Sequence, residues 1–170
     1  NIVNILPVEP GEKVSAMLHV REFGDMYIFM VTRSGTVKRL PLDAIKNIRK
    51  TGIRALSIAE DDELITVRLT DGKQNILIAT HEGYAICFDE NDVRPMGREA
   101  AGVRGIKLRE GDYVVGAGRA GGGTALLSVT ENGYGKRTEL DEYLRGGDGE
   151  RQPQSRCGIG LNNYNCTDTT

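Results

Sequence analysis

Apolar residues gather along this chain in short runs, and each run ends at a turn that contains glycine. The turns are Thr32-Arg33-Ser34-Gly35, Thr80-His81-Glu82-Gly83 and Thr130-Glu131-Asn132-Gly133, and a second strand-like run follows each of them. Short apolar runs on both sides of a glycine that tolerates a positive φ are typical of β-hairpins. The pattern therefore predicts three hairpins, centred on Gly35, Gly83 and Gly133.

The hairpins belong to a longer repeat, because two further segments recur behind them in a fixed order. The first segment recurs as Gly52-Ile53-Arg54 and Gly102-Val103-Arg104, and less closely as Gly158-Ile159-Gly160-Leu161. The second segment recurs as Gly11-Glu12-Lys13-Val14, Asp62-Glu63-Leu64-Ile65 and Gly111-Asp112-Tyr113-Val114. A period of about 40 to 50 residues with several strands per unit is typical of a propeller blade and not of a helical solenoid. We expect a nearly all-β fold whose sheets lie side by side around an axis.

The repeat predicts how the chain is divided. Residues 1–17 are expected to close a preceding blade, and 18–65, 66–115 and an incomplete 116–170 form the copies that follow. The first residue is not Met, and the last copy stops before the acidic turn and strand that finish the other two. We interpret residues 1–170 as a fragment of a single domain, taken from a longer array.

Composition narrows the cellular location and the metal or disulfide chemistry that we expect for this chain. No apolar run approaches the roughly 20 residues that a membrane span needs, and no signal peptide opens the chain. Cys87, Cys157 and Cys166 lack the paired spacing of a metal site or a disulfide framework. We expect a cytoplasmic, reducing location with no membrane contact, no metal and no cofactor, and Cys87 packed as a small apolar side chain.

Charge is the feature that suggests a function. The net charge of −2 alone argues against nucleic-acid binding, but the basic residues are not evenly spread. One stretch holds seven cations against Asp43, and a second holds five against Glu99. These cations are Arg33, Lys38, Arg39, Lys46, Arg49, Lys50 and Arg54, and then Arg94, Arg98, Arg104, Lys107 and Arg109.

A repeat that carries this segregation forward places each basic patch at the same edge of the ring. A basic rim is a surface along which duplex DNA can bend, held by phosphate contacts without base reading. The alternative is ordinary solvated charge on loops. The third copy is weaker, because acids match its cations. The candidate DNA-binding residues are Arg33, Lys38, Arg39, Lys46, Arg49, Lys50, Arg54, Arg94, Arg98, Arg104, Lys136, Arg137 and Arg156.

Two of these pairs, Lys38-Arg39 and Lys136-Arg137, are predicted where a strand emerges at the rim. No catalytic residue is predicted. His19 and His81 are isolated, with no plausible Ser or Cys nucleophile motif beside them, so an enzyme is the least favoured class for this fragment.

Four longer motifs resemble the C-terminal domain of DNA gyrase A, which belongs to the type IIA topoisomerases. They are Gly-Thr-Val-Lys-Arg-Leu-Pro-Leu at 35–42, Asp-Val-Arg-Pro-Met-Gly-Arg at 92–98, Ala-Ala-Gly-Val-Arg-Gly-Ile-Lys-Leu at 100–108 and Thr-Glu-Asn-Gly-Tyr-Gly-Lys-Arg-Thr at 130–138. The resemblance extends over essentially the whole chain.

The resemblance implies a β-pinwheel, a propeller-like ring of usually six blades that exchange strands with their neighbours, of which about three are present here. It also implies wrapping of double-stranded DNA around a basic perimeter, in support of ATP-dependent negative supercoiling. The partners implied are the rest of gyrase A and the gyrase B protein. Catalysis in the family belongs to other regions, so the fragment itself is not expected to be an enzyme.

The chain departs from the family at the gyrase box, a Gln-Arg-Arg-Gly-Gly-Lys-Gly-like loop in the first blade that wrapping requires. Residues 154–160 have its spacing without its lysine and one glycine, and 145–149 have the glycines with Asp148 in place of the lysine. We interpret both as degenerate loops that cross between blades. Two other functions stay open: the C-terminal domain of the topoisomerase IV counterpart of gyrase A, which steers substrate choice, and a propeller that serves as a protein-binding scaffold.

Overall fold

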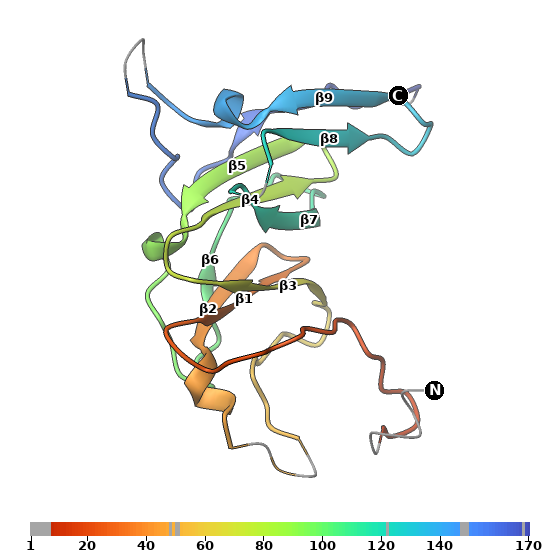
Figure 1. The fold of residues 1–170 in the computed structure, drawn as a ribbon. Helices are drawn as coiled ribbons and strands as arrows, with labels where there is room; N and C mark the ends of the chain where they lie inside the picture. Colours follow the sequence, from red (N-terminus) through yellow and green to blue (C-terminus); the bar gives the residue numbers. More distant parts are fainter. Residues whose placement is uncertain (1–7, 48, 50–51, 122, 147–149, 168) are drawn as a thin grey trace.

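The computed structural model describes residues 8–47, 49, 52–121, 123–146, 150–167 and 169–170. Within these ranges the only helices are single 3-10 turns, and the rest of the regular structure is strand (Figure 1). The prediction of a nearly all-β fold is confirmed. No helix among the described residues combines the length and the apolar character that crossing a bilayer requires.

The strands form three antiparallel sheets, which follow one another from bottom to top in Figure 1. The first has the order β3-β1-β2-β6, the second β10-β5-β4-β7, and the third contains β8 and β9. Their bounds are β1 (Tyr27–Thr32), β2 (Thr36–Pro41), β3 (Leu64–Thr70), β4 (Asn75–Thr80), β5 (Tyr84–Asp89), β6 (Val103–Arg104), β7 (Val114–Arg119), β8 (Ala125–Val129), β9 (Gly135–Glu139) and β10 (Leu161–Asn162).

Each sheet is built on one of the predicted hairpins, and the repeated threonine explains why the chain turns there. In the first hairpin the carbonyl oxygen of Thr32 accepts from the Gly35 N–H at 3.0 Å, and its Oγ1 accepts from the Thr36 N–H at 3.2 Å. The same pair of bonds recurs at Thr80 and Thr130. The three hairpin positions predicted from the sequence are confirmed.

Outer strands are exchanged between neighbouring copies of the repeat. β6 lies behind the second hairpin in sequence but pairs with β2 of the first, where Val37 faces Val103. β10 lies behind the third hairpin and pairs with β5 of the second, where Ala85 faces Leu161. This strand exchange agrees with the pinwheel expectation.

The strands β3 and β7, called inner strands below, each follow an acidic turn that is hydrogen-bonded to a hairpin turn. The N–H of Ser34 donates to Asp62 Oδ1 at 2.9 Å, and the N–H of Glu82 donates to Asp112 Oδ1 at 3.0 Å. Asp62 is therefore equivalent to Asp112 and not to Gly111. The sequence alignment of this middle copy was one residue out of register, because an aspartate stands at residue 61 where the other copies have glycine.

The main core lies between the first and second sheets. Phe29 and Val37 of the first pack with Ile78 and Phe88 of the second, and the two phenylalanine rings are 6.4 Å apart. A strand that is covered on both faces needs apolar residues at successive positions. This packing, together with the apolar clusters on the opposite faces of β1 and β4, explains the continuous apolar runs that end at the first two predicted turns.

The three cysteines differ in their surroundings, which predicts how they react. Cys87 is buried, and burial raises the pKa of its thiol to about 11, whereas Cys157 and Cys166 are exposed. Because the thiolate is the nucleophile, we expect a disulfide reagent at mildly alkaline pH to label two thiols per native chain. The third thiol should react only after unfolding in urea, and a Cys87→Ala variant should give two under both conditions. Three equally fast thiols in the native chain would contradict the packing of β5.

Candidate nucleic-acid interface

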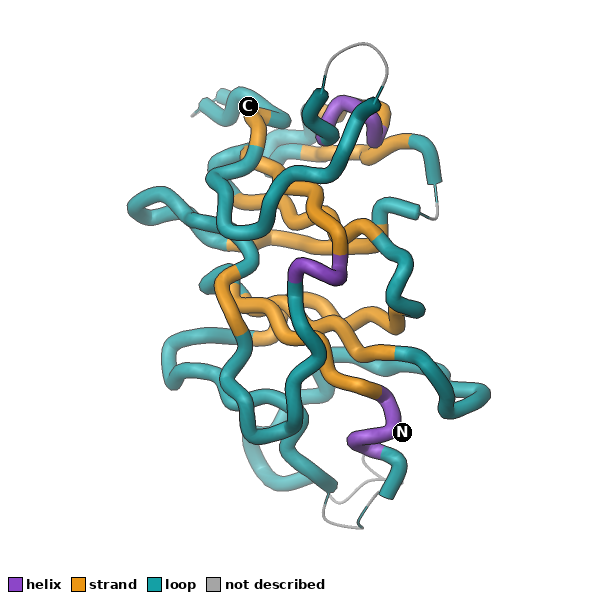
Figure 2. The backbone as a smooth tube through the Cα atoms, turned by 90° about the vertical axis from the view of Figure 1, so that its left-hand side faces the viewer, coloured by secondary structure: helices purple, strands orange, loops and turns teal. Residues whose placement is uncertain are grey.

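Three connecting segments carry most of the predicted basic residues. They run over 46–54, 93–104 and 144–160, and they follow the 3-10 turns η2 (Leu42–Ile45), η3 (Glu90–Asp92) and η4 (Leu140–Tyr143). Figure 2 shows the side of the molecule on which these turns lie, one for each hairpin. The second and third segments end in β6 and β10, so each crosses to the outer edge of the preceding sheet.

A buried lysine holds the second connecting segment in place. Lys38 lies in the middle of β2, and its Nζ donates to the carbonyl oxygens of Arg98 at 2.8 Å and Ala100 at 2.6 Å. Burial lowers the pKa of Lys38, and the nearby Glu99 carboxylate acts in the opposite direction. Two of its donor protons are bonded to backbone carbonyls and the side chain is fully buried, so it is not available to a phosphate.

A buried arginine holds the start of the same segment. Arg39 Nε lies 3.3 Å from Glu90 Oε2, and both side chains are almost completely buried. Its Nη1 donates to Asn91 Oδ1 at 2.9 Å, and its guanidinium carbon lies 3.8 Å from the centroid of the Tyr27 ring. The other oxygen of Glu90 accepts from the Gln74 N–H at 2.8 Å.

These contacts change the role of two predicted DNA ligands. Lys38 and Arg39 do not emerge at the rim, and that expectation is wrong. The connecting segment covers β2, as shown by the Met96 N–H donating to the carbonyl oxygen of Arg39 at 2.9 Å. Both side chains act as positioning residues for the segment, so we leave them out of the interface proposed below.

Five of the cations on the first two connecting segments face solvent. Arg98 is half-buried, and Lys50 lies outside the described residues. Among the ion pairs of the described residues, none joins a carboxylate to the five exposed members of this group. These five are Lys46, Arg49, Arg54, Arg94 and Arg104, and they are called the exposed basic set below.

Three predicted residues lie apart from the exposed basic set. The guanidinium carbon of Arg33, in the first hairpin turn, lies 3.6 Å from the centroid of the Tyr113 ring, on which His81 stacks at 4.6 Å. On β9, Lys136 donates to the carbonyl oxygen of Asn163 at 3.0 Å, and Arg137 lies 3.2 Å from Glu139. Arg33 thus links neighbouring hairpin turns, and Arg137 is already paired.

Arg156 joins the third connecting segment to the second. Its Nε donates to the carbonyl oxygen of Asp92 at 3.1 Å, and its Nη1 donates to that of Arg104. The N–H of Cys157, a residue with a φ of 70°, donates to Gly105 at 3.0 Å. Residues 154–160 therefore cross from one blade to the next, as predicted for this loop. In the second box-like stretch, residues 145–149, positions 147–149 lie outside the described residues.

Lys107 is an exposed cation that was absent from the candidate set. Lys107 follows β6, and its N–H donates to the carbonyl oxygen of Gly158 at 2.9 Å, so it sits where the second and third connecting segments meet. The signal was present in the sequence, because Lys107 shares the basic run of Arg104.

Comparisons with known proteins agree with this architecture. The family model described as "DNA gyrase C-terminal domain, beta-propeller" matches residues 27–71, 74–120 and 124–149. DNA gyrase A of Haloquadratum walsbyi is 42% identical over 94% of the chain, and that of Salmonella typhimurium is 47% identical over 84%. The chain spans only 18% and 16% of the length of these two relatives.

Two solved structures share the fold. A C-terminal domain of DNA topoisomerase IV superposes with a TM-score of 0.82 at 31% identity, covering 94% of this chain and 48% of that one. A DNA gyrase A C-terminal domain gives a TM-score of 0.79 at 25% identity, covering 95% of this chain and 51% of that one. This chain therefore matches about half of each solved domain.

Proposed function

Because this chain belongs to the DNA gyrase C-terminal domain family, we propose that it is a module that binds and bends double-stranded DNA without reading its sequence. In this proposal the module serves a cytoplasmic gyrase, together with the rest of gyrase A and with the gyrase B protein, and supports ATP-dependent negative supercoiling. The curated relatives favour gyrase over topoisomerase IV, because two gyrase A proteins are 42% and 47% identical to it.

The observation that carries the proposal is the exposed basic set. Its five cations lie on two connecting segments, whose only acid is Glu99. Cations without a carboxylate partner can neutralise phosphates and release counterions, which supplies most of the affinity of non-specific DNA binding. The net charge of −2 is no obstacle, because the acids lie elsewhere in the chain.

The geometry of the connecting segments favours bending over straight docking. Segments two and three meet at Arg104 and Arg156, so the basic surface passes from one blade to the next. Bending a site of 20 to 30 base pairs through 40 to 90° costs on the order of 1–6 kcal/mol, which extra phosphate contacts can offset. The third hairpin contributes less, since Arg137 pairs with Glu139 and Arg151 lies 4.0 Å from Glu142.

We expect charge reversal in the exposed basic set to weaken DNA binding. With five phosphates neutralised, log K against log salt has a slope of about −4.5. An Arg94→Glu/Arg104→Glu variant should make this slope shallower, about −2.7 or closer to zero, and lower the affinity for a short duplex by at least about tenfold. Fluorescence anisotropy of a labelled duplex, titrated at several salt concentrations, measures both quantities.

Arg68→Glu/Arg119→Glu is the matched control. Both residues are exposed on the inner strands β3 and β7, and the change in net charge is the same. The control should keep the wild-type slope. An equal loss in both variants would assign the effect to net charge, and an affinity that does not depend on salt would favour a protein-binding scaffold.

A further inference from the structure

The second connecting segment has its two ends on different sheets. It begins behind η3, where the Glu90 N–H donates to the carbonyl oxygen of Gln74, the residue before β4, at 2.9 Å. It ends in β6, which pairs with β2 of the first sheet. Directly after β6, the Gly105 N–H donates to the carbonyl oxygen of Gly35 at 2.8 Å. The start of the segment is therefore fixed to the second blade, and its end is fixed to the first.

One guanidinium bridges these two ends. Arg156, on the third connecting segment, donates from Nε to the carbonyl oxygen of Asp92 at 3.1 Å and from Nη1 to that of Arg104. Asp92 is the last residue of η3, and Arg104 is the last residue of β6. The backbone N–H of Arg156 also lies 3.4 Å from Asp92 Oδ2. Arg156 thus contacts the second connecting segment at both its start and its end.

A strained backbone position follows this guanidinium. Cys157 has a φ of 70°, in the left-handed region that a residue other than glycine adopts only at a cost in free energy. In this conformation its N–H donates to the carbonyl oxygen of Gly105 at 3.0 Å. Its Sγ lies 3.0 Å from Arg156 Nη1 and 3.0 Å from the carbonyl oxygen of Arg104. The local conformation therefore keeps residues 156 and 157 against the end of β6.

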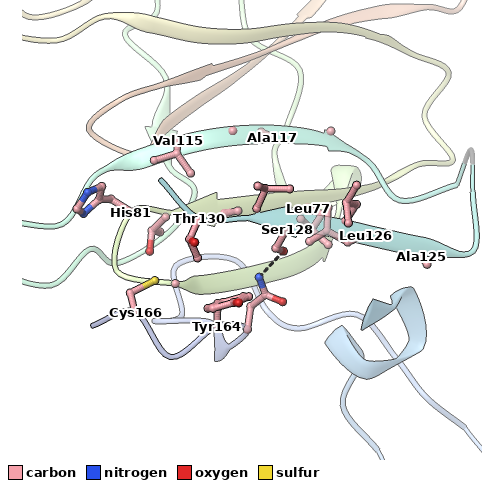
Figure 3. Close-up of a pocket in the computed structure, with 18 of the residues that line it drawn as sticks. Leu77, His81, Val115, Ala117, Ala125, Leu126, Ser128, Thr130, Tyr164 and Cys166 are labelled. Atoms are coloured by element: carbon pink, nitrogen blue, oxygen red, sulfur yellow. Dashed lines mark hydrogen bonds between the residues drawn. The ribbon is translucent and has the colours of Figure 1, made fainter. Parts of the chain in front are cut away.

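The third connecting segment is itself fixed to the third hairpin. Asn163, directly after β10, donates from Nδ2 to Ser128 Oγ of β8 at 2.8 Å (Figure 3). On the side of the inner strands, β3 and β7 pack against each other, whereas β7 and β8 border a cavity of about 740 Å³. The third hairpin is therefore linked to the other two blades through its connecting segment, on the side of the outer strands.

Two members of the exposed basic set lie at the ends that Arg156 bridges. Arg94 follows Asp92 by two residues, and Arg104 supplies one of the two carbonyl oxygens. We propose that Arg156 is a positioning residue that fixes the angle between neighbouring blades, and with it the relative placement of the phosphates held by Arg94 and Arg104. This inference rests on the function proposed above. It assigns to Arg156 the bend of the DNA and not a phosphate contact.

Donor geometry explains why this position requires an arginine. A guanidinium is planar and donates in fixed directions, so it can bond carbonyl oxygens on two separate elements at once. A lysine carries the same charge as a point charge on a flexible stem, and it does not reproduce both directions. A phosphate contact tolerates this exchange, because counterion release depends on charge. Arg156→Lys therefore separates a bridging role from phosphate binding.

The first test needs no DNA. The N–H groups of Lys107 and Cys157 bond across the junction of the second and third connecting segments, at 2.9 and 3.0 Å. In an Arg156→Lys variant both amides should exchange hydrogen at least about tenfold faster, because bonds from a charged donor are among the stronger ones and their loss loosens the junction. Amide exchange followed by two-dimensional NMR measures both rates.

Arg151→Lys is the matched control for this test. It is the same substitution at an exposed position of the same connecting segment, and Arg151 bonds only to the η4 end of that segment. The control should leave both exchange rates at their wild-type values. Equal rates in the wild type and in Arg156→Lys would overturn the proposal.

The second test measures the bend. Energy transfer between dyes at the two ends of a duplex of about 30 base pairs rises when bound protein bends the duplex. At saturation, Arg156→Lys and Arg156→Gln should both lose most of this rise, and both should keep the wild-type slope of log K against log salt. A slope shallower by about 0.9 in Arg156→Gln, with slope and bend unchanged in Arg156→Lys, would identify a phosphate contact and overturn the proposal.

The wild-type result separates this inference from the function on which it rests. A wild-type protein that does not bend the duplex would contradict the proposed function and, with it, the role of Arg156. A wild-type protein that bends the duplex, together with an Arg156→Lys variant that bends it equally, would overturn only the role of Arg156.

Discussion

Replacing Arg39 with methionine should lower the free energy of unfolding by about 3–5 kcal/mol. The substitution leaves the Glu90 carboxylate in the core without its 3.3 Å ion pair, and it removes the bond to Asn91 at the start of the connecting segment. Within the described residues, the two facing atoms Arg39 Nε and Glu90 Oε2 have no hydrogen bond to anything else. Urea unfolding followed by far-UV circular dichroism measures the loss.

The Arg39→Met/Glu90→Met double variant tests the cause. Removing both charges avoids the unpaired carboxylate, so the double variant should be more stable than Arg39→Met alone. As an exposed control, Arg137→Met breaks the 3.2 Å pair with Glu139 at the equivalent position of the third hairpin, and it should cost less than about 1 kcal/mol. Equal losses at Arg39 and Arg137 would contradict the importance of burial.

The second large effect is expected at Gly83, the glycine of the second hairpin turn. Its φ is +80°, and an added Cβ would overlap the carbonyl oxygen of Tyr164 and lie 2.9 Å from Cys166 Sγ. Gly83→Ala should therefore cost about 3 kcal/mol or more, from left-handed strain and from displacement of this segment. The midpoint of urea denaturation checks the value.

The equivalent glycines provide a graded control. Gly133 has a φ of +86° with no atom within 4 Å of an added Cβ, so Gly133→Ala should cost only the strain, about 1–2 kcal/mol. Gly35, at φ +81°, would meet the side chain of Ile106 at 2.9 Å, and its alanine variant should fall between the two. A different order would mean that close approach to Tyr164 does not govern the second turn.

The sequence predicted the turns that short-range hydrogen bonds determine, and it missed the burial that depends on contacts with a neighbouring copy of the repeat. Threonine and glycine at fixed positions determine each hairpin turn through bonds within five residues, so Gly35, Gly83 and Gly133 could be identified directly. Lys38-Arg39 and Lys136-Arg137 occupy equivalent strand positions, yet the first pair is buried and the second is exposed. The difference arises because residues 93–104 cover β2. The Lys-Arg pair itself does not indicate whether another segment will bury it.

The same limit applies to strands and to the basic rim. Residues 14–20 follow the same kind of turn as β3 and β7, yet within the described residues they belong to no sheet. The exposed basic set could be predicted in part, since clustering of cations is visible in the sequence. Which cations turn inward is decided by tertiary contacts, such as those of Lys38 with Arg98 and of Arg156 with Arg104.

Exchange of the outer strands has a cost during synthesis. Val37 is complete on the ribosome long before Val103, its partner, has been translated. At 5–20 residues per second the first hairpin waits on the order of several seconds with one bare edge. Nascent chains on the same messenger could pair through such edges, so we expect the array to depend on holdase chaperones, and to depend on them less when translation of residues 42–104 is fast.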